Sequence, residues 1–255
     1  MVSPGGLKIG GVFDVHSSAG DGFGWPSVAA LQEGGFVAAW SGESSLLQRF
    51  DAQGNKVGGE QLLDSQSLKP SVGAFSGGSF VAVWQKESDI FGRQFDNMGQ
   101  PLTDIFSVNE STNGVQNNPS VSVIAGDNFV VSWDSPAGIR YQLFDELGSK
   151  IGGEKAASAL PGTYPIVAAV QDDEFAIAWY SYPDTILLRG FSQDGPIHEE
   201  VEVNGLKAKP NLSDGMIPSV ATFSDGGLIV VWPLHYGGRK AYAQRFDKDG
   251  NKLYH

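Results

Sequence analysis

The sequence contains no cysteine and has few charged residues. None of its 255 residues is Cys, and 18% are Asp, Glu, Lys or Arg, whereas about a quarter is usual in soluble domains. The lack of cysteine excludes a disulfide framework, a thiolate zinc site and a cysteine nucleophile. No apolar run approaches the roughly 18 residues that a membrane-spanning helix needs, so we expect no membrane insertion.

Positive charge is also scarce. The chain has 17 Lys and Arg against 29 Asp and Glu, which gives a formal net charge of -12. Because no block of Lys and Arg is present, the sequence argues against nucleic acid and anionic membranes as partners. Hydrophobic residues make up 41% of the chain. A chain of this length and composition can bury a large core, which excludes wholesale disorder.

Glycine, in contrast, is abundant and marks a repeat. The chain has 34 Gly residues, and five Pro residues each stand 14 positions before a Trp. A Phe follows each Trp after 10–14 positions, and a Gly follows each Phe after four. A period of this length is typical of tandem structural repeats. The repeats are centred on Trp40, Trp84, Trp133, Trp179 and Trp232.

Each repeat predicts four short strands. An apolar strand such as 26–31 is followed by a glycine turn and by a second strand that ends in Trp, such as 36–40. A third strand ends at the Phe, and an Asp-x-x-Gly turn leads to a fourth, more polar strand. Asp and Gly suit this turn because Asp caps the backbone ahead and Gly supplies a positive φ. The sequence therefore predicts an all-β fold, a five-bladed β-propeller that forms a single domain over residues 1–255.

The two ends of the chain predict how the ring of blades closes. Residues 6–11 match the segment that follows the turn in other repeats, such as 54–59. The chain ends at Gly250-Asn251-Lys252-Leu253, where another such segment begins. We therefore expect the N-terminal strand, about Val12–His16, to complete the last blade by pairing with Ala241–Phe246.

The repeat resembles a known family through its third strand, which reads Gln-Arg-Phe-Asp-x-x-Gly. The matching residues are Gln48–Asp51, Arg93–Asp96 and Gln244–Asp247. Similar repeats occur in tandem in very large secreted bacterial proteins of the haemolysin and adhesin kind, which often carry calcium-binding repeats. The resemblance implies an extracellular or cell-surface location in a bacterium and a monomeric domain of a longer chain. By blade number the protein is also similar to tachylectin-type five-bladed lectins, a fold-level analogy.

The repeated residues are interpreted as scaffold. Each repeated Trp ends an apolar strand at the same phase, so we expect these five side chains to pack between neighbouring blades. We expect the Asp of each turn to cap the turn and no cofactor to be needed. Calcium at Asp247–Gly250 is the alternative, although one extra carboxylate supplies few oxygen ligands. No two of the four His residues have metal-ligand spacing, so no metal site is predicted.

The unrepeated residues of the variable loops are the candidate site. Variable loops on a rigid frame usually carry binding, and here they share one rim of the predicted ring. Trp25 is the one Trp outside the repeat, and its homologous positions should lie near the mouth of the central channel. Aromatic faces with polar neighbours suit sugar rings, but such aromatics also serve to plug the wide end. The candidate ligand-binding residues are Trp25, Tyr164, Tyr180, Tyr182, Asp184, His235, Tyr236 and Asp21.

These patterns favour a non-catalytic extracellular binding module with a carbohydrate or other cell-surface ligand. Because the rim residues are not repeated, we expect one or two sites rather than five. A structural or protein-docking module of an adhesin is one alternative. Another is a polysaccharide-cleaving enzyme, which needs two carboxylates across one cleft. The predicted inner strands contain no Asp or Glu, so such carboxylates would come from the rim: Glu43, Glu87, Asp89, Asp134, Asp184 and Asp214.

Overall fold

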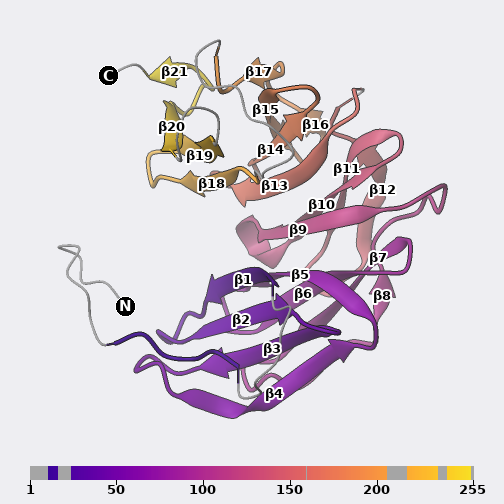
Figure 1. Ribbon diagram of the computed structural model, residues 1–255, viewed down its shortest axis with the longest axis vertical. Helices are drawn as coiled ribbons and strands as arrows, with labels where there is room; N and C mark the ends of the chain where they lie inside the picture. Colours follow the sequence, from indigo (N-terminus) through magenta and orange to yellow (C-terminus); the bar gives the residue numbers. More distant parts are fainter. Residues whose placement is uncertain (1–10, 17–23, 159, 206–216, 235–239, 254–255) are drawn as a thin grey trace.

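The computed structural model describes residues 11–16, 24–158, 160–205, 217–234 and 240–253. Their strands form five antiparallel sheets, and each sheet is built from consecutive strands of one repeat. Figure 1 shows the first sheet at one end of the molecule, the fifth at the other, and β9–β12 between them. The prediction of short antiparallel strands in each repeat is confirmed.

The sheets comprise the following elements. The first contains β1 (Gly24–Ala30), β2 (Phe36–Ser41), β3 (Ser45–Phe50) and β4 (Lys56–Asp64). The second contains β5 (Ser67–Ala74), β6 (Phe80–Lys86), β7 (Asp89–Phe95) and β8 (Phe106–Ser107). The third contains β9 (Asn117–Val123), β10 (Phe129–Ser135), β11 (Gly138–Phe144) and β12 (Lys150–Ala156), with a 3₁₀ turn at Ala125–Asp127. The fourth contains β13 (Thr163–Ala169), β14 (Phe175–Ser181), β15 (Thr185–Ser192), β16 (Gly195–Pro196) and β17 (Val201–Glu202). The fifth contains β18 (Ser219–Thr222), β19 (Leu228–Leu234), β20 (Lys240–Phe246) and β21 (Lys252–Leu253).

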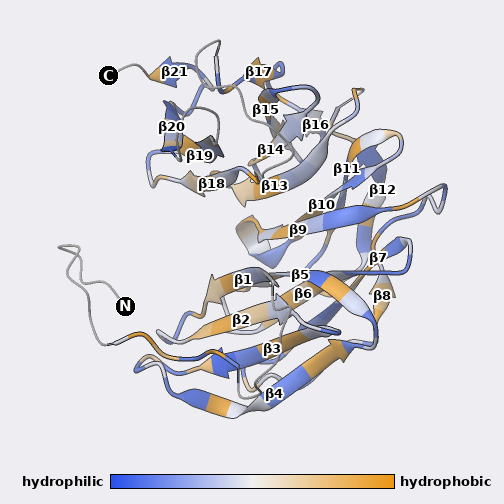
Figure 2. Ribbon diagram, in the orientation of Figure 1, coloured by the Kyte–Doolittle hydropathy of each residue, from blue (hydrophilic) through white to orange (hydrophobic). Residues whose placement is uncertain are grey.

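Neighbouring sheets meet face to face, with the first strands of the sheets side by side. β1 contacts β5, β5 contacts β9, β9 contacts β13 and β13 contacts β18. The first strands therefore lie innermost, and the two-residue strands β8 and β21 form outer edges. Figure 2 shows hydrophobic residues along β2, and hydrophilic stretches between hydrophobic ones along β4.

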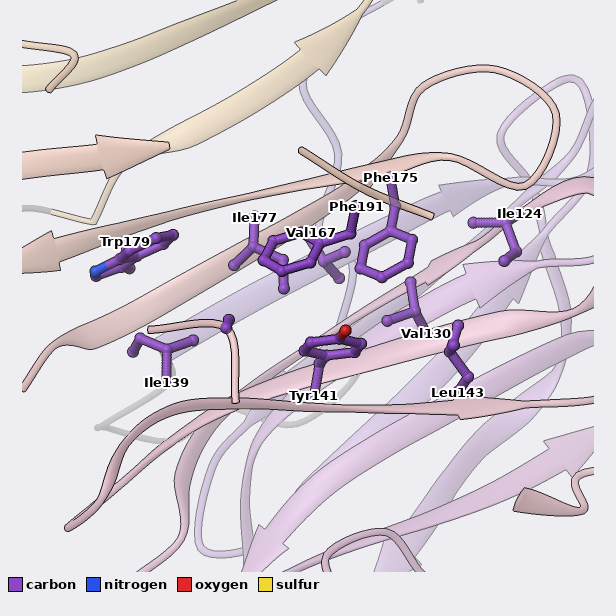
Figure 3. Packing of buried hydrophobic residues seen from close by; sticks show 11 residues of the cluster. Ile124, Val130, Ile139, Tyr141, Leu143, Val167, Phe175, Ile177, Trp179 and Phe191 are labelled. Carbon is purple, nitrogen blue, oxygen red and sulfur yellow. The ribbon is translucent and has the colours of Figure 1, made fainter. Parts of the chain in front are cut away.

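The hydrophobic core lies between the sheets. Each of four clusters combines residues of two successive sheets and contains one repeated Trp. These residues are Trp84, Trp133, Trp179 and Trp232. In Figure 3, Trp179 and Phe175 of the fourth sheet face Ile139 and Tyr141 of the third. The expectation that the five repeated tryptophans pack between sheets is confirmed for these four, each of which is buried within such a cluster. Trp40 is instead buried in a cluster of the first sheet with Ala38 and Phe50.

The turn after the third strand is capped by Asp in four of the five sheets, as the sequence predicts. Oδ1 of Asp51 accepts hydrogen bonds from the backbone N–H groups of Gln53 and Asn55, at 2.9 and 2.8 Å. The hydrogen bond from the Asn55 side chain contributes most to lowering the pKa of this carboxyl. Asp96, Asp145 and Asp247 accept the equivalent backbone hydrogen bonds in their own turns.

The expected closure by the N-terminal strand is wrong. Residues 11–16 form no strand, and β20 pairs with β21 through Arg245 and Phe246. The Phe13 ring lies 5.7 Å from the Phe50 ring, and Val15 packs against the cluster around Trp40. The last sheet is completed locally because a strand that follows a tight turn has a far smaller closure entropy to overcome than one from the other end of the chain. The segment 11–16 instead covers part of the first sheet.

The first and fifth sheets each keep one face without a neighbouring sheet in the described part of the chain. Val28 of β1 is 67% exposed, whereas Val72 occupies the same repeat position in β5 and is 5% exposed. Val231 of β19 is likewise exposed, whereas its counterpart Val83 is fully buried against the third sheet. At each of the four boundaries between successive sheets, the equivalents of these two apolar faces pack against each other.

Candidate functional site

The innermost strands share an unusual backbone at their first residues. The residue before the repeat Pro is left-handed in four repeats, with φ of 55° at Trp25, 52° at Lys69, 51° at Asn118 and 54° at Tyr164. The register between first and second strands shifts at each of these positions. A left-handed φ is uncommon for residues other than glycine. Its recurrence at one repeat position indicates a bulge that aims this side chain away from the regular sheet.

The side chains at these bulges converge on one cavity of about 220 Å³. It lies where the innermost strands of all five sheets begin, so the expected convergence of the homologous positions is observed. Its lining comprises Trp25, Pro26, Ser27, Lys69, Pro70, Ser71, Asn118, Pro119, Ser120, Tyr164, Pro165, Ile166 and Ile217. We refer to it as the axial cavity.

One wall of the axial cavity is aromatic. The rings of Trp25 and Tyr164 are stacked, with centroids 6.0 Å apart and planes 16° from parallel. Lys69 Nζ lies 4.9 Å from the Trp25 centroid, within the range of a cation–π interaction. Trp25 is 39% exposed, so part of this aromatic wall is accessible to solvent beside a positive charge.

A hydrogen-bond network surrounds Asn118, another lining residue. Asn118 Nδ2 donates to Asp134 Oδ1 at 2.8 Å and to Thr163 Oγ1 at 3.3 Å, and Thr163 Oγ1 donates to Asp134 Oδ2 at 3.1 Å. Lys69 Nζ donates to Asn117 Oδ1 at 2.6 Å. The amide orientation is fixed by the carboxylate, since only the NH₂ group can donate to Asp134. Asn118 Oδ1 is consequently buried without a hydrogen-bond partner.

Burial shifts the two charged groups of this network toward their neutral forms. It raises the pKa of Asp134, and hydrogen bonds from Asn118 and Thr163 oppose the shift. It lowers the pKa of Lys69, and attraction to the Asp134 carboxylate opposes that shift. Removing water from a charge disfavours the charged form, whereas a nearby opposite charge favours it.

Serine hydroxyls connect the sheets below the bulges and also line the axial cavity. Ser27 Oγ accepts a hydrogen bond from the N–H of Val72, Ser71 Oγ from that of Val121, and Ser120 Oγ from that of Val167, each at 3.1 Å. A hydroxyl that accepts one hydrogen bond keeps its own hydrogen to donate. The cavity therefore holds three hydroxyl donors at equivalent positions.

Replacement of Asp134 by asparagine is expected to change how stability depends on pH. Because the pKa of Asp134 is raised from its ordinary 3.8, the folded state binds this proton more strongly than the unfolded chain. The stabilisation of the folded state by protonated Asp134 is complete below pH 3.8 and is lost as the pH rises through the pKa of Asp134 in the folded state. Urea unfolding at a series of pH values should show the wild type losing stability relative to Asp134→Asn across this window.

Asp51→Asn is the control with the opposite sign. The pKa of Asp51 is lowered from 3.8 by its turn hydrogen bonds, so its contribution is present above pH 3.8 and is lost on acidification. If both variants differ from the wild type in the same direction, the assignment of Asp134 as a buried carboxyl is wrong.

The other candidate residues that the structure describes lie outside the axial cavity. Tyr180 is buried and its hydroxyl donates to the carbonyl of Pro183, whereas Tyr182 is exposed. With Pro161, Gly162 and Thr163 they line a second hollow of about 170 Å³ beside the aromatic wall. The backbone carbonyl of Asp184 accepts a hydrogen bond from Asn204 Nδ2 at 2.9 Å. Asp21, His235 and Tyr236 lie outside the described residues.

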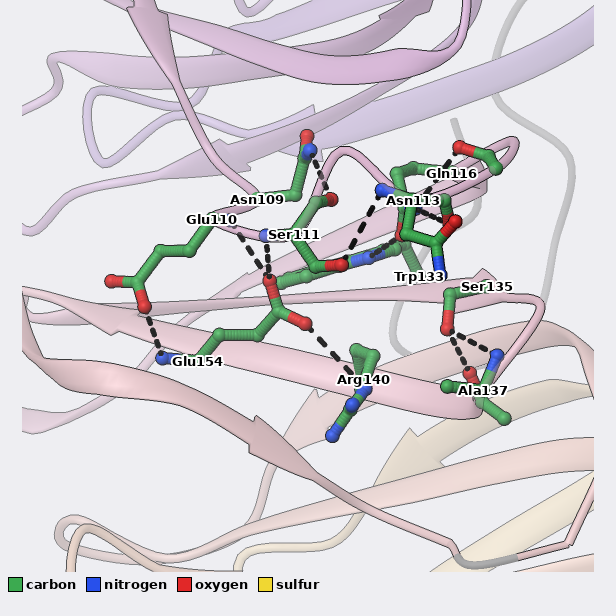
Figure 4. A network of polar contacts seen from close by, with 12 residues as sticks. Asn109, Glu110, Ser111, Asn113, Gln116, Trp133, Ser135, Ala137, Arg140 and Glu154 are labelled. Atoms are coloured by element: carbon green, nitrogen blue, oxygen red, sulfur yellow. Dashed lines mark hydrogen bonds and ion pairs between the residues drawn. The ribbon is translucent and has the colours of Figure 1, made fainter.

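The rim segment 109–118 is braced by the scaffold. Glu154 Oε2 accepts hydrogen bonds from the backbone N–H groups of Glu110 and Ser111 at 2.8 and 3.1 Å, and Arg140 Nε lies 3.5 Å from Glu154 Oε1 (Figure 4). Trp133 Nε1 donates to Gln116 Oε1 at 2.9 Å. Asp89, one of the rim carboxylates, accepts a hydrogen bond from Asn109. These contacts assign this part of the rim to support.

Two kinds of site are not found in the described part of the chain. No group of three or more His, Asp or Glu side chains there is arranged to hold a metal ion. Among the same residues, no helix has the length and apolar character needed to cross a bilayer.

Comparison with known proteins identifies the fold. No protein-family model matches the sequence, and no curated protein matches it. The structure is similar to a Dyadobacter fermentans protein of unknown function, with a TM-score of 0.67 and 10% identity over 91% of this chain and 78% of that one. It is also similar to the six-bladed β-propeller lectin of the fungus Aleuria aurantia, with a TM-score of 0.63 and 10% identity over 89% and 77%. A Hadza microbial sialidase gives 0.62 and 9% over 91% and 57%.

The chain therefore has a β-propeller fold, with five sheets in the described residues. At such low identity the likeness carries the fold alone, so the case for function rests on the site itself.

Proposed function

We propose that the protein is a non-catalytic binding module that holds a carbohydrate in the axial cavity. The observation that supports this most is the stacked Trp25–Tyr164 pair beside hydroxyl and amide groups. A sugar ring has apolar C–H faces and polar hydroxyl edges, so a flat aromatic wall beside hydrogen-bonding groups complements it. The lectin among the similar structures is described as recognising fucose, which is compatible with this use of the fold.

We further propose that the five sheets are the five blades of a propeller and that the chain belongs to a large secreted bacterial protein of the adhesin kind. The Gln-Arg-Phe-Asp repeat supports this assignment. The four bulge positions and Ile217 line one axial cavity, so we propose a single site of this kind. A sugar bound there would bring the adhesin to a cell or matrix surface.

A sugar-cleaving activity is less well supported. Glycoside hydrolysis generally requires two carboxyl groups on either side of the scissile bond. The described lining of the axial cavity contains no Asp or Glu. Asp134 and Asp89, two of the rim carboxylates, are engaged by the side-chain amides of Asn118 and Asn109.

A glycan array followed by titration calorimetry tests the proposed function. The folded protein is expected to bind a restricted set of glycans, and Trp25→Ala is expected to weaken binding about tenfold, which corresponds to ~1.4 kcal/mol. Tyr182→Ala is the matched control, because Tyr182 is an exposed aromatic residue outside the axial cavity.

Two results would contradict the proposal. If a folded protein binds no glycan, the module serves as a structural or protein-docking unit. If Tyr182→Ala weakens binding while Trp25→Ala does not, the site is the neighbouring hollow.

A further inference from the structure

Building on the proposed function, we propose that the sugar held in the axial cavity carries a carboxylate, as uronic and sialic acids do, and that Lys69 binds it. The inference concerns the chemistry of the ligand and not only its class. It depends on the charge of the lining, on the state of the Lys69 ammonium group and on the balance of donors and acceptors.

The charge of the lining is opposite to that of the protein as a whole. The formal net charge of the chain is -12, yet Lys69 is the single charged side chain among the described lining residues. An overall negative charge disfavours extended polyanions at long range, where salt screens it. For a single carboxylate inside the cavity, the largest electrostatic interaction is with the nearest charge, which is the Lys69 ammonium.

The Lys69 ammonium retains capacity for an anion. One of its three hydrogens is used by Asn117 Oδ1 at 2.6 Å, and the group lies over the Trp25 ring. Burial lowers the pKa of Lys69, which reflects the water that the ammonium has lost. A carboxylate would replace that lost hydration, and the attraction between opposite charges is stronger away from bulk water.

The remaining groups of the lining are mostly donors. The hydroxyls of Ser27, Ser71 and Ser120 each accept one backbone hydrogen bond and keep a hydrogen to donate. An ionised carboxylate only accepts hydrogen bonds, so a donor-rich lining suits it.

Asp134 does not compete for the site. Its carboxylate oxygens accept hydrogen bonds from Asn118 Nδ2 and Thr163 Oγ1, and the residue is absent from the cavity lining. Its attraction favours the protonated form of Lys69. It thus acts as a counter-charge behind the wall, which keeps the ammonium charged while leaving its exposed side open to a ligand.

Paired sugars provide the test. Methyl glucoside and methyl glucuronide differ mainly in the carboxylate, and so do methyl galactoside and methyl galacturonide. The methyl glycoside of N-acetylneuraminic acid, with its carboxylate free, serves as a third acid. Titration calorimetry at low salt is expected to show an acid bound about tenfold more tightly than its neutral partner. This preference should shrink as salt is added. Lys69→Met should remove this preference for the acid over its neutral partner, and Lys69→Arg should retain it.

The control is Lys86→Met, which removes a partly exposed lysine paired with Asp64 at 2.8 Å and should leave the preference unchanged. If neutral sugars bind as tightly as their acids, or if Lys69→Met keeps the preference, the inference is overturned and the proposed function stands. If no sugar of either kind binds, the proposed function itself fails. Should Lys69→Met not fold, the acid preference and its salt dependence in the wild type decide.

Discussion

Replacing Trp84 by alanine is expected to lower the free energy of unfolding by about 3–5 kcal/mol. Trp84 is fully buried in the cluster between the first and second sheets, where it lies with Val72 and Phe80. Removing its ring leaves a cavity that two packed sheets cannot easily collapse around, because each sheet is held by its own strand pairing. Urea or guanidinium unfolding followed by circular dichroism measures the loss.

Trp25→Ala is the matched control, since the same side chain is removed from a different setting. Trp25 is partly exposed and lines the axial cavity rather than a sheet interface. We expect its loss to change stability by less than ~1 kcal/mol, as is common for surface positions. Equal losses for the two variants would contradict the division between scaffold tryptophans and the unrepeated one.

The second large effect is expected from a charge placed between sheets. Val72→Glu should destabilise the protein by more than about 4 kcal/mol or prevent folding, because it buries an unpaired carboxylate. Val28→Glu alters the same position of the first repeat, where the side chain is largely exposed. It should change the free energy of unfolding by about 0.5 kcal/mol or less. Thermal and urea unfolding of the two variants provide the comparison.

The comparison of Val28→Glu with Val72→Glu also tests whether the ring of sheets is closed in solution. If Val28→Glu is as harmful as Val72→Glu, the open face of the first sheet is covered in solution. Sedimentation then separates two ways of covering it: a dimer means that a second copy packs there, and a monomer means that the chain covers this face itself.

The sheets could be predicted because their signals are local and repeated. The Pro-to-Trp spacing sets the first two strands, and the Asp-x-x-Gly turn begins the fourth. The closure could not be predicted in this way. Residues 6–11 resemble 54–59. This match indicates that both segments have the composition of an outer strand, but it does not indicate which sheet edge either segment joins. A nearby hairpin partner, β21, takes that edge.

The site could be predicted in part. Trp25 and Tyr164 were expected to meet because homologous positions of a repeat converge at the axis, and they do. Tyr180 and Tyr182 belong to a predicted rim loop, but they line the neighbouring hollow and not the axial cavity. Ser27 and its counterparts are not among the candidate residues that the sequence indicates. Their role in lining the axial cavity depends on the bulge that precedes them. That bulge was not apparent from the order of residues.

The left-handed position before four of the repeat Pro residues has a consequence for how such a protein can diversify. Trp, Lys, Asn and Tyr adopt nearly the same φ there, so the scaffold accommodates side chains that differ widely in size, charge and polarity. Each of these repeats thus contributes one interchangeable residue to a shared pocket. Exchange of repeats by recombination would alter the pocket one wall at a time and leave the folding of each unit unchanged. A gene built from such units can generate new recognition properties without having to evolve a new framework.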